Sequence, residues 1–369
     1  ASSSAEGADT LYDIEKITFS YGTASEVTYY TSEMIHGTKD LISGWESYAA
    51  NAVSGDKAIV MDGTSYTFTN NENLISWALA DDSTYPWADV EGYQDLIGDA
   101  LEEYSKVADL NFQYFGHYSS VSAADTSGAN FIFKMSDLGD WNSAGQMTVA
   151  QAFFPSNYHG DTYYPYFNFI MAGPDNTLEF NKWALPSFST ESMYQTILHE
   201  IGHSLGLKHP FNAGYANPNS SAKGEYDNTW TIMSYTDASS ANPFGAPHYA
   251  STPMSLDVLA LEYIYGRADL RDFEGDTEHA VISSNSYQTM VDYSGINTIN
   301  FSTAAQGWTI FASDPSSAGY AIEQEQVFPN AQLIELLGTF YNITGSTYDD
   351  TIFGSTVQNI ILAGEGNDV

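Results

Sequence analysis

The sequence predicts an α+β protein of two domains, a mixed domain over residues 1–266 and an all-β domain over residues 267–369. A chain of 369 residues exceeds what one hydrophobic core usually organises. Helix and strand periodicities alternate up to about residue 266, whereas short period-two segments separated by turn residues follow it. A nine-residue repeat at the end of the chain predicts a parallel β-roll in the second domain.

The first domain opens with weakly patterned sequence and continues with strands and one long helix. Apolar spacing predicts, in order, a short helix, two strands, a long helix capped by Asp89 and two further strands, at residues 41–52, 57–70, 74–80, 90–107, 111–115 and 130–135. A loop of small residues is expected between the last two strands. This order alone indicates an α/β or α+β domain.

One stretch of the first domain carries three histidines and a glutamate at metal-binding spacing. His199 and His203 are four residues apart, so on a helix they present their imidazoles to one cation. Glu200 points to a different side, where it is available to a metal-bound water rather than to the metal. Gly206 ends the helix in the left-handed conformation and returns His209 toward the other two histidines. Three histidines and one water make the open tetrahedral site of catalytic zinc.

The sequence around these histidines favours a helix with a buried face. Ser189 or Thr190 can cap it, and Glu191 suits its first turn. Its apolar stripe consists of Met193, Ile197, Ile201 and Leu205. The alternative is that the histidines are ordinary residues of a buried helix. A His-Glu-x-x-His pattern occurs by chance, but the added glycine and third histidine at fixed offsets are much rarer.

A methionine turn beneath the metal is the second feature expected of such a site, and the chain supplies Thr231-Ile232-Met233-Ser234-Tyr235. The zinc motif ending in His209-Pro210, together with this turn, resembles the serralysins, secreted bacterial metalloproteases of the metzincin group. Matrixins and astacins carry different residues at these places. The resemblance implies a twisted, mostly parallel sheet plus helices, with Met233 beneath the zinc ligands. It also implies that Tyr235 is a switchable extra zinc ligand that stabilises the transition state. Taken alone, either residue would be ordinary core packing.

Two further parts of the first domain follow from this resemblance. Residues 151–155 correspond to an edge strand over the cleft, where Ala152 and Phe153 are expected to pair with an extended peptide through backbone hydrogen bonds. An ordinary buried strand is the alternative. A helix starting at Thr252-Pro253 and stopping at Gly266 resembles the helix that closes the protease domain, so the domain boundary is expected after it.

The second domain is predicted from short alternating strands and from the repeat. The strands are expected at residues 289–293, 298–301, 308–311 and 332–337. In the repeat, Asp350, Asn359 and Asp368 recur every nine residues, as in a parallel β-roll whose turns bind calcium. Asp350 and Asp368 are expected on the same side, where they can share one ion. Only the last unit is close to the consensus, and the chain is expected to be truncated there.

A second calcium site is predicted upstream of the repeat. The loop that contains Asp292 and Asn297 resembles a serralysin loop that binds calcium together with a Gly-Asp-Thr segment, here represented by Gly275 and Thr277. Asn297 replaces the aspartate usual in the family and so removes one charge. A polar hairpin turn is the alternative.

The composition limits the function. The chain has 47 acidic against 10 basic residues and a formal net charge of −37, which disfavours binding to nucleic acids and anionic membranes. It has no cysteine, which excludes disulfides, thiolate metal sites and a cysteine nucleophile. No apolar run is long enough to span a bilayer. The resemblance implies a secreted, extracellular monomer with a propeptide and a C-terminal export signal, stabilised by several calcium ions.

These observations predict a zinc endopeptidase that acts on polypeptides, with one catalytic zinc on His199, His203 and His209. Glu200 is expected to take a proton from the attacking water and pass it to the leaving amine. Tyr235 is expected to donate to the developing oxyanion. The alternatives are a calcium-binding interaction module with a vestigial or structural zinc site, and a metzincin of another family that lacks the calcium roll.

Overall fold

The computed structural model describes most residues from 74 onward and two strand pairs before them. The described residues are 17–21, 25–29, 60–61, 64–65, 74–140, 143, 147–152, 177–182, 189–207, 209, 227–235, 248–265, 267–268, 275–282, 284, 286–314, 318–324 and 331–369. The helix expected at 41–52 lies outside them. Upstream of residue 74 the structure describes two antiparallel strand pairs, β1 (Ile17–Tyr21) with β2 (Ser25–Tyr29) and β3 (Val60–Met61) with β4 (Thr64–Ser65). The prediction of one strand over 57–70 is therefore wrong, because β3 and β4 pair with each other.

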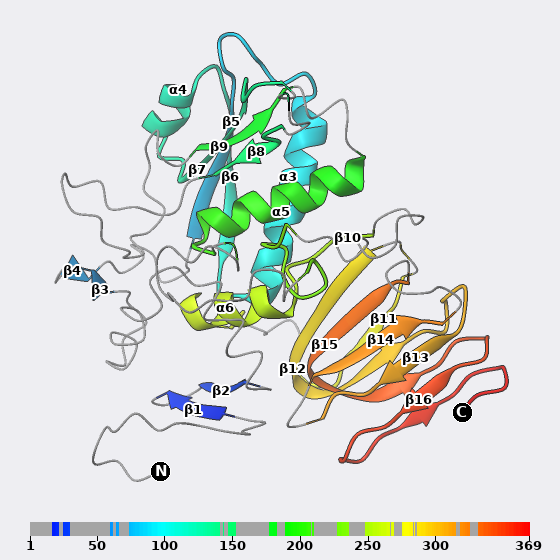
Figure 1. Ribbon diagram of the computed structural model, residues 1–369. Helices are drawn as coiled ribbons and strands as arrows, with labels where there is room; N and C mark the ends of the chain where they lie inside the picture. The colour runs from blue at the N-terminus through cyan, green and yellow to red at the C-terminus, as the bar shows by residue number, and fades with distance from the viewer. Residues whose placement is uncertain are drawn as a thin grey trace.

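A five-stranded sheet with the order β6-β5-β7-β9-β8 forms the framework of the first part (Figure 1). Its strands are β5 (Leu74–Ala80), β6 (Asn111–Tyr118), β7 (Phe131–Ser136), β8 (Ala150–Gln151) and β9 (Thr177–Asn181). All neighbours are parallel except β8, which lies antiparallel at the edge beside β9. Strand β5 is buried along nearly its whole length, as expected of a central parallel strand covered on both faces. The predicted strands at 74–80, 111–115 and 130–135 are confirmed, the second with three more residues.

Two long helices, α3 (Val90–Val107) and α5 (Thr190–Ser204), contact each other beside this sheet (Figure 1). Helix α3 has the predicted bounds, and the Asp89 side chain caps it by accepting from the Gly92 N–H. Its buried side chains are Ile97, Ala100, Leu101, Tyr104 and Val107. A short helix, α4 (Val121–Thr126), stands where the sequence predicted only a loop. Ser120 caps it, and Ala124 is small enough to pack closely against Ala78 and Ala80 of β5.

The second part is an eight-stranded sheet whose main path is β10-β12-β15-β14-β13-β16, with β11 beside β12 and β17 beside β15. The strands are β10 (Tyr249–Ala250), β11 (Glu278–Ala280), β12 (Ser286–Asn300), β13 (Trp308–Phe311), β14 (Gly319–Glu323), β15 (Leu333–Thr344), β16 (Thr351–Phe353) and β17 (Ile361–Leu362). The strands predicted at 289–293 and 298–301 are one strand, β12, whose register shifts between Asp292 and Asn297. Strand β14 was not predicted.

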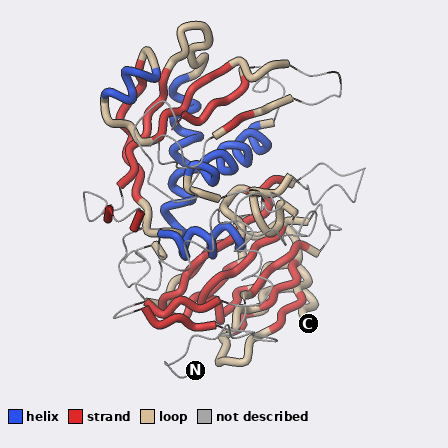
Figure 2. Tube along the Cα trace, turned by 60° about the vertical axis from the view of Figure 1, so that its left-hand side comes forward, coloured by secondary structure: helices blue, strands red, loops and turns tan. Residues whose placement is uncertain are grey.

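Helix α6 (Ser255–Tyr265) lies between the two sheets (Figures 1 and 2). It begins two residues after the predicted Pro253, and the expected stop at Gly266 lies outside the described residues. The largest hydrophobic core contains α6 residues such as Leu259, side chains of the first sheet, and Tyr287 and Leu337 of the second sheet. The two parts of the chain therefore share buried apolar surface. Among the residues that the structure describes, no helix is long and apolar enough to span a lipid bilayer.

Candidate metal centre

The three histidines are positioned by α5 and by the turn that ends it. The Ser189 side chain caps the helix by accepting from the Ser192 N–H, as one of the two predicted caps. The predicted stripe of Met193, Ile197, Ile201 and Leu205 is buried. Gly206 has φ of 99°, the left-handed conformation that favours glycine, and directly follows the last turn of the helix. The sharp turn brings His209 back beside the helix, as predicted.

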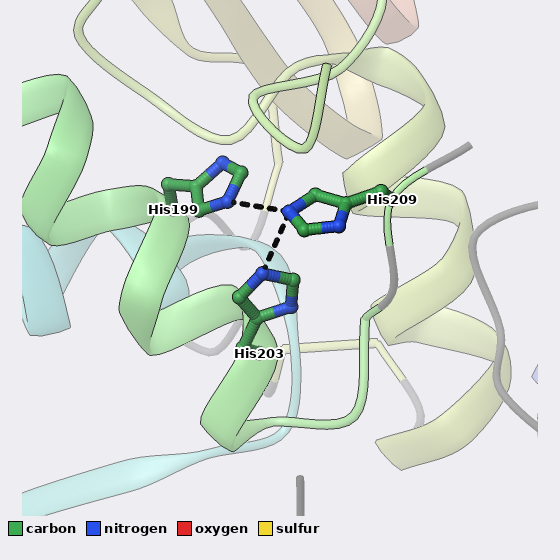
Figure 3. Close-up of side chains that lie close together, drawn as sticks. All are labelled: His199, His203 and His209. Atoms are coloured by element: carbon green, nitrogen blue, oxygen red, sulfur yellow. Dashed lines mark hydrogen bonds between the residues drawn. The ribbon is translucent and has the colours of Figure 1, made fainter. Parts of the chain in front are cut away.

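The three imidazoles converge through their Nε2 atoms (Figure 3). The Nε2 atom of His209 lies 3.1 Å from that of His199 and 3.0 Å from that of His203. The three histidines form the one group of metal-ligand type found among the described residues, with ligand atoms all within 4.8 Å of one another. In a tetrahedral zinc site with Zn–N bonds of about 2.05 Å, ligand nitrogens lie about 3.3 Å apart. The arrangement therefore fits a zinc ion with little adjustment.

Backbone carbonyls hold the other nitrogen of two of these rings. His199 Nδ1 lies 2.7 Å from the carbonyl of Ile232, and His203 Nδ1 lies 2.7 Å from the carbonyl of Leu207. A carbonyl only accepts, so Nδ1 carries the proton and Nε2 presents its lone pair to the common centre. Burial lowers the pKa of His199 well below its usual value, with a smaller contribution from His203. Burial lowers the pKa of His203 to about 4. Both rings are thus neutral, the form that binds metal.

Glu200 is buried beside the histidines. Its Oε2 atom has no hydrogen-bond partner among the residues described, while the carboxylate accepts from the backbone N–H of Ala152. Burial raises the pKa of Glu200 to about 8, against the opposing effect of that N–H. A buried carboxyl oxygen without a partner is costly, and a water held by a cation would satisfy it. The positive charge of the cation would also favour the ionised carboxylate.

The turn that contains Met233 lies under the histidines. Met233 is fully buried, and a Cβ added to Gly202 of α5 would lie only 2.7 Å from its sulfur. The backbone of this turn is held by Asp257, a buried residue in the first turn of α6. Its carboxylate accepts from Thr231 Oγ1 at 2.6 Å and from the Ile232 N–H at 2.8 Å.

Asp257 was missed by the sequence analysis. Its carboxylate also accepts from the Met254 N–H at 2.9 Å, and burial raises its pKa to about 7. The one available indication was an acidic residue flanked by Leu256 and Val258 in an apolar helix. The hydroxyls of Tyr104 and Tyr265, which donate to the carbonyls of Leu198 and Leu205 at 2.6 and 2.8 Å, were also missed. Such contacts join residues distant in sequence and leave no local pattern.

Tyr235 stands beside the histidines and is largely exposed, at 69%. Its ring centroid lies 4.4 Å from that of His209 and 5.6 Å from that of His199. Partial burial and the negative charge of Glu200 raise the pKa of its phenol. Ala152 follows the edge strand β8, and Phe153 lies outside the described residues.

The residues predicted to bind calcium also come together in two places. Asn297 Oδ1 accepts from the Thr277 N–H at 3.0 Å. Gly275, the first residue of the Gly-Asp-Thr segment, has φ of 100°. Asp292 lies in the same strand as Asn297, at the register shift of β12. In the repeat, Asp368 Oδ1 accepts from the Asp350 N–H at 2.9 Å, so the two aspartates meet through the backbone of one and the carboxylate of the other.

Comparisons with known proteins agree with this geometry. The Matrixin family profile matches residues 68–216, and a Met-zincin profile matches residues 185–341. Serralysin C of Dickeya chrysanthemi is 26% identical over 98% of this chain and 71% of its own length. Metallopeptidase AprA of Pseudomonas marginalis is 27% identical over 71% of this chain and 54% of its own length. Serralysin of Proteus mirabilis is 31% identical, over 47% of this chain and 34% of its own length.

The sheet, the three converging imidazoles and the profile matches resemble those of metzincins, a class of zinc-dependent endopeptidases. The Matrixin match includes the zinc motif that metzincins share. It ends before the methionine turn. The similarity that extends over nearly the whole chain is to a serralysin. The chain is similar to serralysin-type metzincins.

Proposed function

We propose that His199, His203 and His209 hold one catalytic zinc ion and that the chain cleaves peptide bonds in proteins. The single observation that carries this proposal is the convergence of three Nε2 lone pairs, two of them fixed by carbonyls on Nδ1. When bound, zinc supplies a Lewis acid for the scissile carbonyl and lowers the pKa of water to about 7. Gly206 sets the path of the chain to His209, and Met233 supports α5 from below.

Glu200 is the general base and then the general acid of the reaction. Its partner-free Oε2 accepts the proton of the attacking water, and the same carboxyl returns it to the leaving amine. The N–H of Ala152 holds the other side of the carboxylate and so fixes its direction. The phenol of Tyr235, beside His209, donates to the oxyanion as it forms, and its raised pKa keeps it protonated for this role.

The edge of the first sheet is the proposed substrate platform. Among the described residues, strand β8 is the last in the sheet order and pairs only with β9, and we propose that its other side receives an extended peptide. Ala152 follows β8 and contacts Glu200 through its backbone N–H, and we propose that Phe153 continues the substrate-binding edge as the family likeness implies. Because the Ala152 N–H donates a hydrogen bond to Glu200, we infer that the Ala152 carbonyl is the group that contacts the substrate.

The remaining features of the chain are proposed from the family likeness and from the strand pairing. We infer a protease domain over 1–266 and an all-β domain over 267–369 in which the repeats wind as an RTX-type parallel β-roll. The parallel pairing of Ile343 with Ile361, two repeats apart, supports the roll. We also propose that the protein is secreted and monomeric. Calcium binding by the second domain stays a prediction of the sequence.

The test is the Glu200→Gln variant together with zinc removal. The variant should retain one zinc, measured by metal analysis, and lose casein hydrolysis by about 10³-fold or more, since the general base is gone. A zinc-selective chelator should abolish the activity of the wild-type protein, and added zinc should restore it. Full activity of Glu200→Gln would exclude the role given to Glu200. A zinc-loaded wild-type protein without proteolytic activity would favour the calcium-binding interaction module instead.

A further inference from the structure

We propose that both predicted calcium positions are closed by the protein's own hydrogen-bond donors, so that the all-β part of this chain holds its turns without calcium. A protein calcium site needs about six to eight oxygen ligands that face one point. In this chain carboxylate oxygens at both positions, and two carbonyls at the first, face N–H and O–H groups instead. The ligand set that the family likeness implies therefore does not fit.

At the first position the side-chain amide of Asn297 takes the place of a cation. Its Nδ2 atom lies 3.2 Å from the carbonyl oxygen of Asp292, 2.9 Å from that of Ser294 and 3.0 Å from Thr339 Oγ1. Its Oδ1 atom accepts from the Thr277 N–H. The reverse amide orientation would turn Oδ1 toward two carbonyl oxygens and Nδ2 toward an N–H, so the network fixes the orientation. The oxygens that would surround an ion surround a donor nitrogen.

The carboxylate of Asp292 is also engaged. It is fully buried, and its Oδ2 atom accepts from His279 Nε2 at 2.9 Å. Its Oδ1 atom accepts from the backbone N–H and the hydroxyl of Ser294 at 3.1 and 3.2 Å. Both oxygens thus bind donors that an incoming ion would have to displace. The Cβ of any residue other than glycine at 295 would lie 2.1 Å from the carbonyl oxygen of Gly275, so the two loops pack too tightly to open easily.

At the second position the side chain of Ser346 stands where the repeat consensus has glycine. Asp350 is buried, and its Oδ2 atom accepts from the Ser346 N–H at 2.6 Å and the Ser346 hydroxyl at 3.0 Å. Its Oδ1 atom accepts from the Trp308 N–H at 2.7 Å. Each carboxylate oxygen of Asp350 therefore accepts from at least one donor. The donor to Oδ1 is a backbone N–H of β13.

The next repeat unit has the same contact without a carboxylate. Asn359 Oδ1 accepts from the Ser355 N–H at 2.9 Å, as Asp350 Oδ2 accepts from the Ser346 N–H four residues before it. The Asn359 Nδ2 atom donates to the carbonyl of Tyr341 at 2.6 Å and to Ser355 Oγ at 2.8 Å. Serine followed four residues later by Asp or Asn thus makes a turn that is complete by itself. Serine stands in place of glycine in both units, and in the second unit Asn359 also replaces the aspartate.

Calcium titration of the whole zinc-loaded protein tests the proposal. Buffers are freed of calcium by a resin, zinc is kept constant, and an equal concentration of magnesium is present throughout, because a surface with 47 acidic and 10 basic residues binds divalent cations weakly. Millimolar calcium should shift the midpoint of thermal unfolding of the wild-type protein by less than about 1 °C. A stoichiometric binding isotherm with a shift of several degrees would overturn the proposal.

The Asn297→Asp variant gives the complementary test. Its second carboxylate oxygen would face the carbonyls of Asp292 and Ser294, which makes an all-oxygen site that lacks a cation. We expect a midpoint lower by roughly 5 °C or more without calcium and recovery on adding calcium but not magnesium. Asn111→Asp adds the same charge at an exposed position and should respond to neither ion. An Asn297→Asp variant as stable as the wild type in both conditions would contradict the position given to the amide. None of these readouts depends on proteolytic activity.

Discussion

The contact between α5 and the methionine turn depends on the absence of a side chain at Gly202. An added Cβ would lie 2.7 Å from Met233 Sδ and 3.1 Å from Tyr104 Oη. Both neighbours are fully buried, and Tyr104 also donates to the Leu198 carbonyl at 2.6 Å. Overpacking of this kind costs about 1–3 kcal/mol. Disturbing the Tyr104 hydrogen bond costs about 1 kcal/mol more.

Replacing Gly202 with alanine also has a favourable effect, because alanine is the better helix former by about 1 kcal/mol. The net expectation for Gly202→Ala is a free energy of unfolding lower by about 1–3 kcal/mol. Zinc affinity should fall together with the stability. The added methyl group displaces Met233 or α5, and α5 carries His199 and His203. Chemical denaturation and competition with a zinc chelator measure the two effects. A Glu200→Gln background removes self-cleavage from both assays.

Gly98 in α3 supplies the matched control. A Cβ there would meet only Trp77 Cζ2 at 3.8 Å, an ordinary van der Waals distance. Gly98→Ala should therefore gain up to about 1 kcal/mol of stability and leave zinc affinity unchanged. The free energy of unfolding should fall in Gly202→Ala and rise in Gly98→Ala, a difference between the variants of about 1–4 kcal/mol. If Gly202→Ala proves as stable as Gly98→Ala, with unchanged zinc affinity, the packing described between α5 and Met233 is wrong.

Three further predictions concern residues around the zinc ligands. Asp257→Ala leaves the donors of Thr231, Ile232 and Met254 without their acceptor and should cost about 3 kcal/mol or more in urea denaturation, with Asp257→Asn milder. The pKa of Asp257 is raised from 3.8 to about 7, so the folded state keeps a proton that the unfolded state releases, and stability falls as pH rises from about 4 to 7. Asp257→Asn should remove this contribution to the pH dependence of stability. If the difference in free energy of unfolding between wild type and variant stays constant from pH 5 to 8, the raised pKa of Asp257 is refuted. Tyr235→Phe should keep zinc and lower kcat/KM by about 10²-fold, and wild-type kinetics in this variant would exclude the oxyanion role.

The parts of the molecule that depend on local sequence could be predicted. The cap at Ser189, the buried stripe of α5 and the left-handed Gly206 all follow from residues within one helix. The convergence of the histidines followed from the same short stretch. Helix α3 was predicted with its bounds because its cap and its apolar spacing agree.

The parts that depend on distant residues could not be predicted. The break expected within β12 is absent because β15 pairs with both halves, and the extra residues between Asp292 and Asn297 are accommodated within β12. Strand β14 has only a short alternating sequence and is a strand because it lies between β13 and β15. The donors that engage Asp292 and Asp350 come in part from His279 and Trp308, which no spacing rule connects to them.

Three hydrogen bonds and the backbone between them connect the second sheet with the zinc site. Glu335 of β15 is half-buried and accepts from the Ser255 N–H at 3.0 Å, at the first residue of α6. Two residues further along α6, Asp257 holds the Ile232 N–H, and the carbonyl of Ile232 accepts from His199. The hydrogen bonds of Asp257 and His199 are buried, so breaking either leaves a group unsatisfied at a cost of about 1–3 kcal/mol. Because Tyr287 and Leu337 of the second sheet also enter the core of the first part, unfolding of the all-β part removes support from the methionine turn. The position of the zinc ligands thus depends on both sheets, although all three ligands come from one short stretch of the chain.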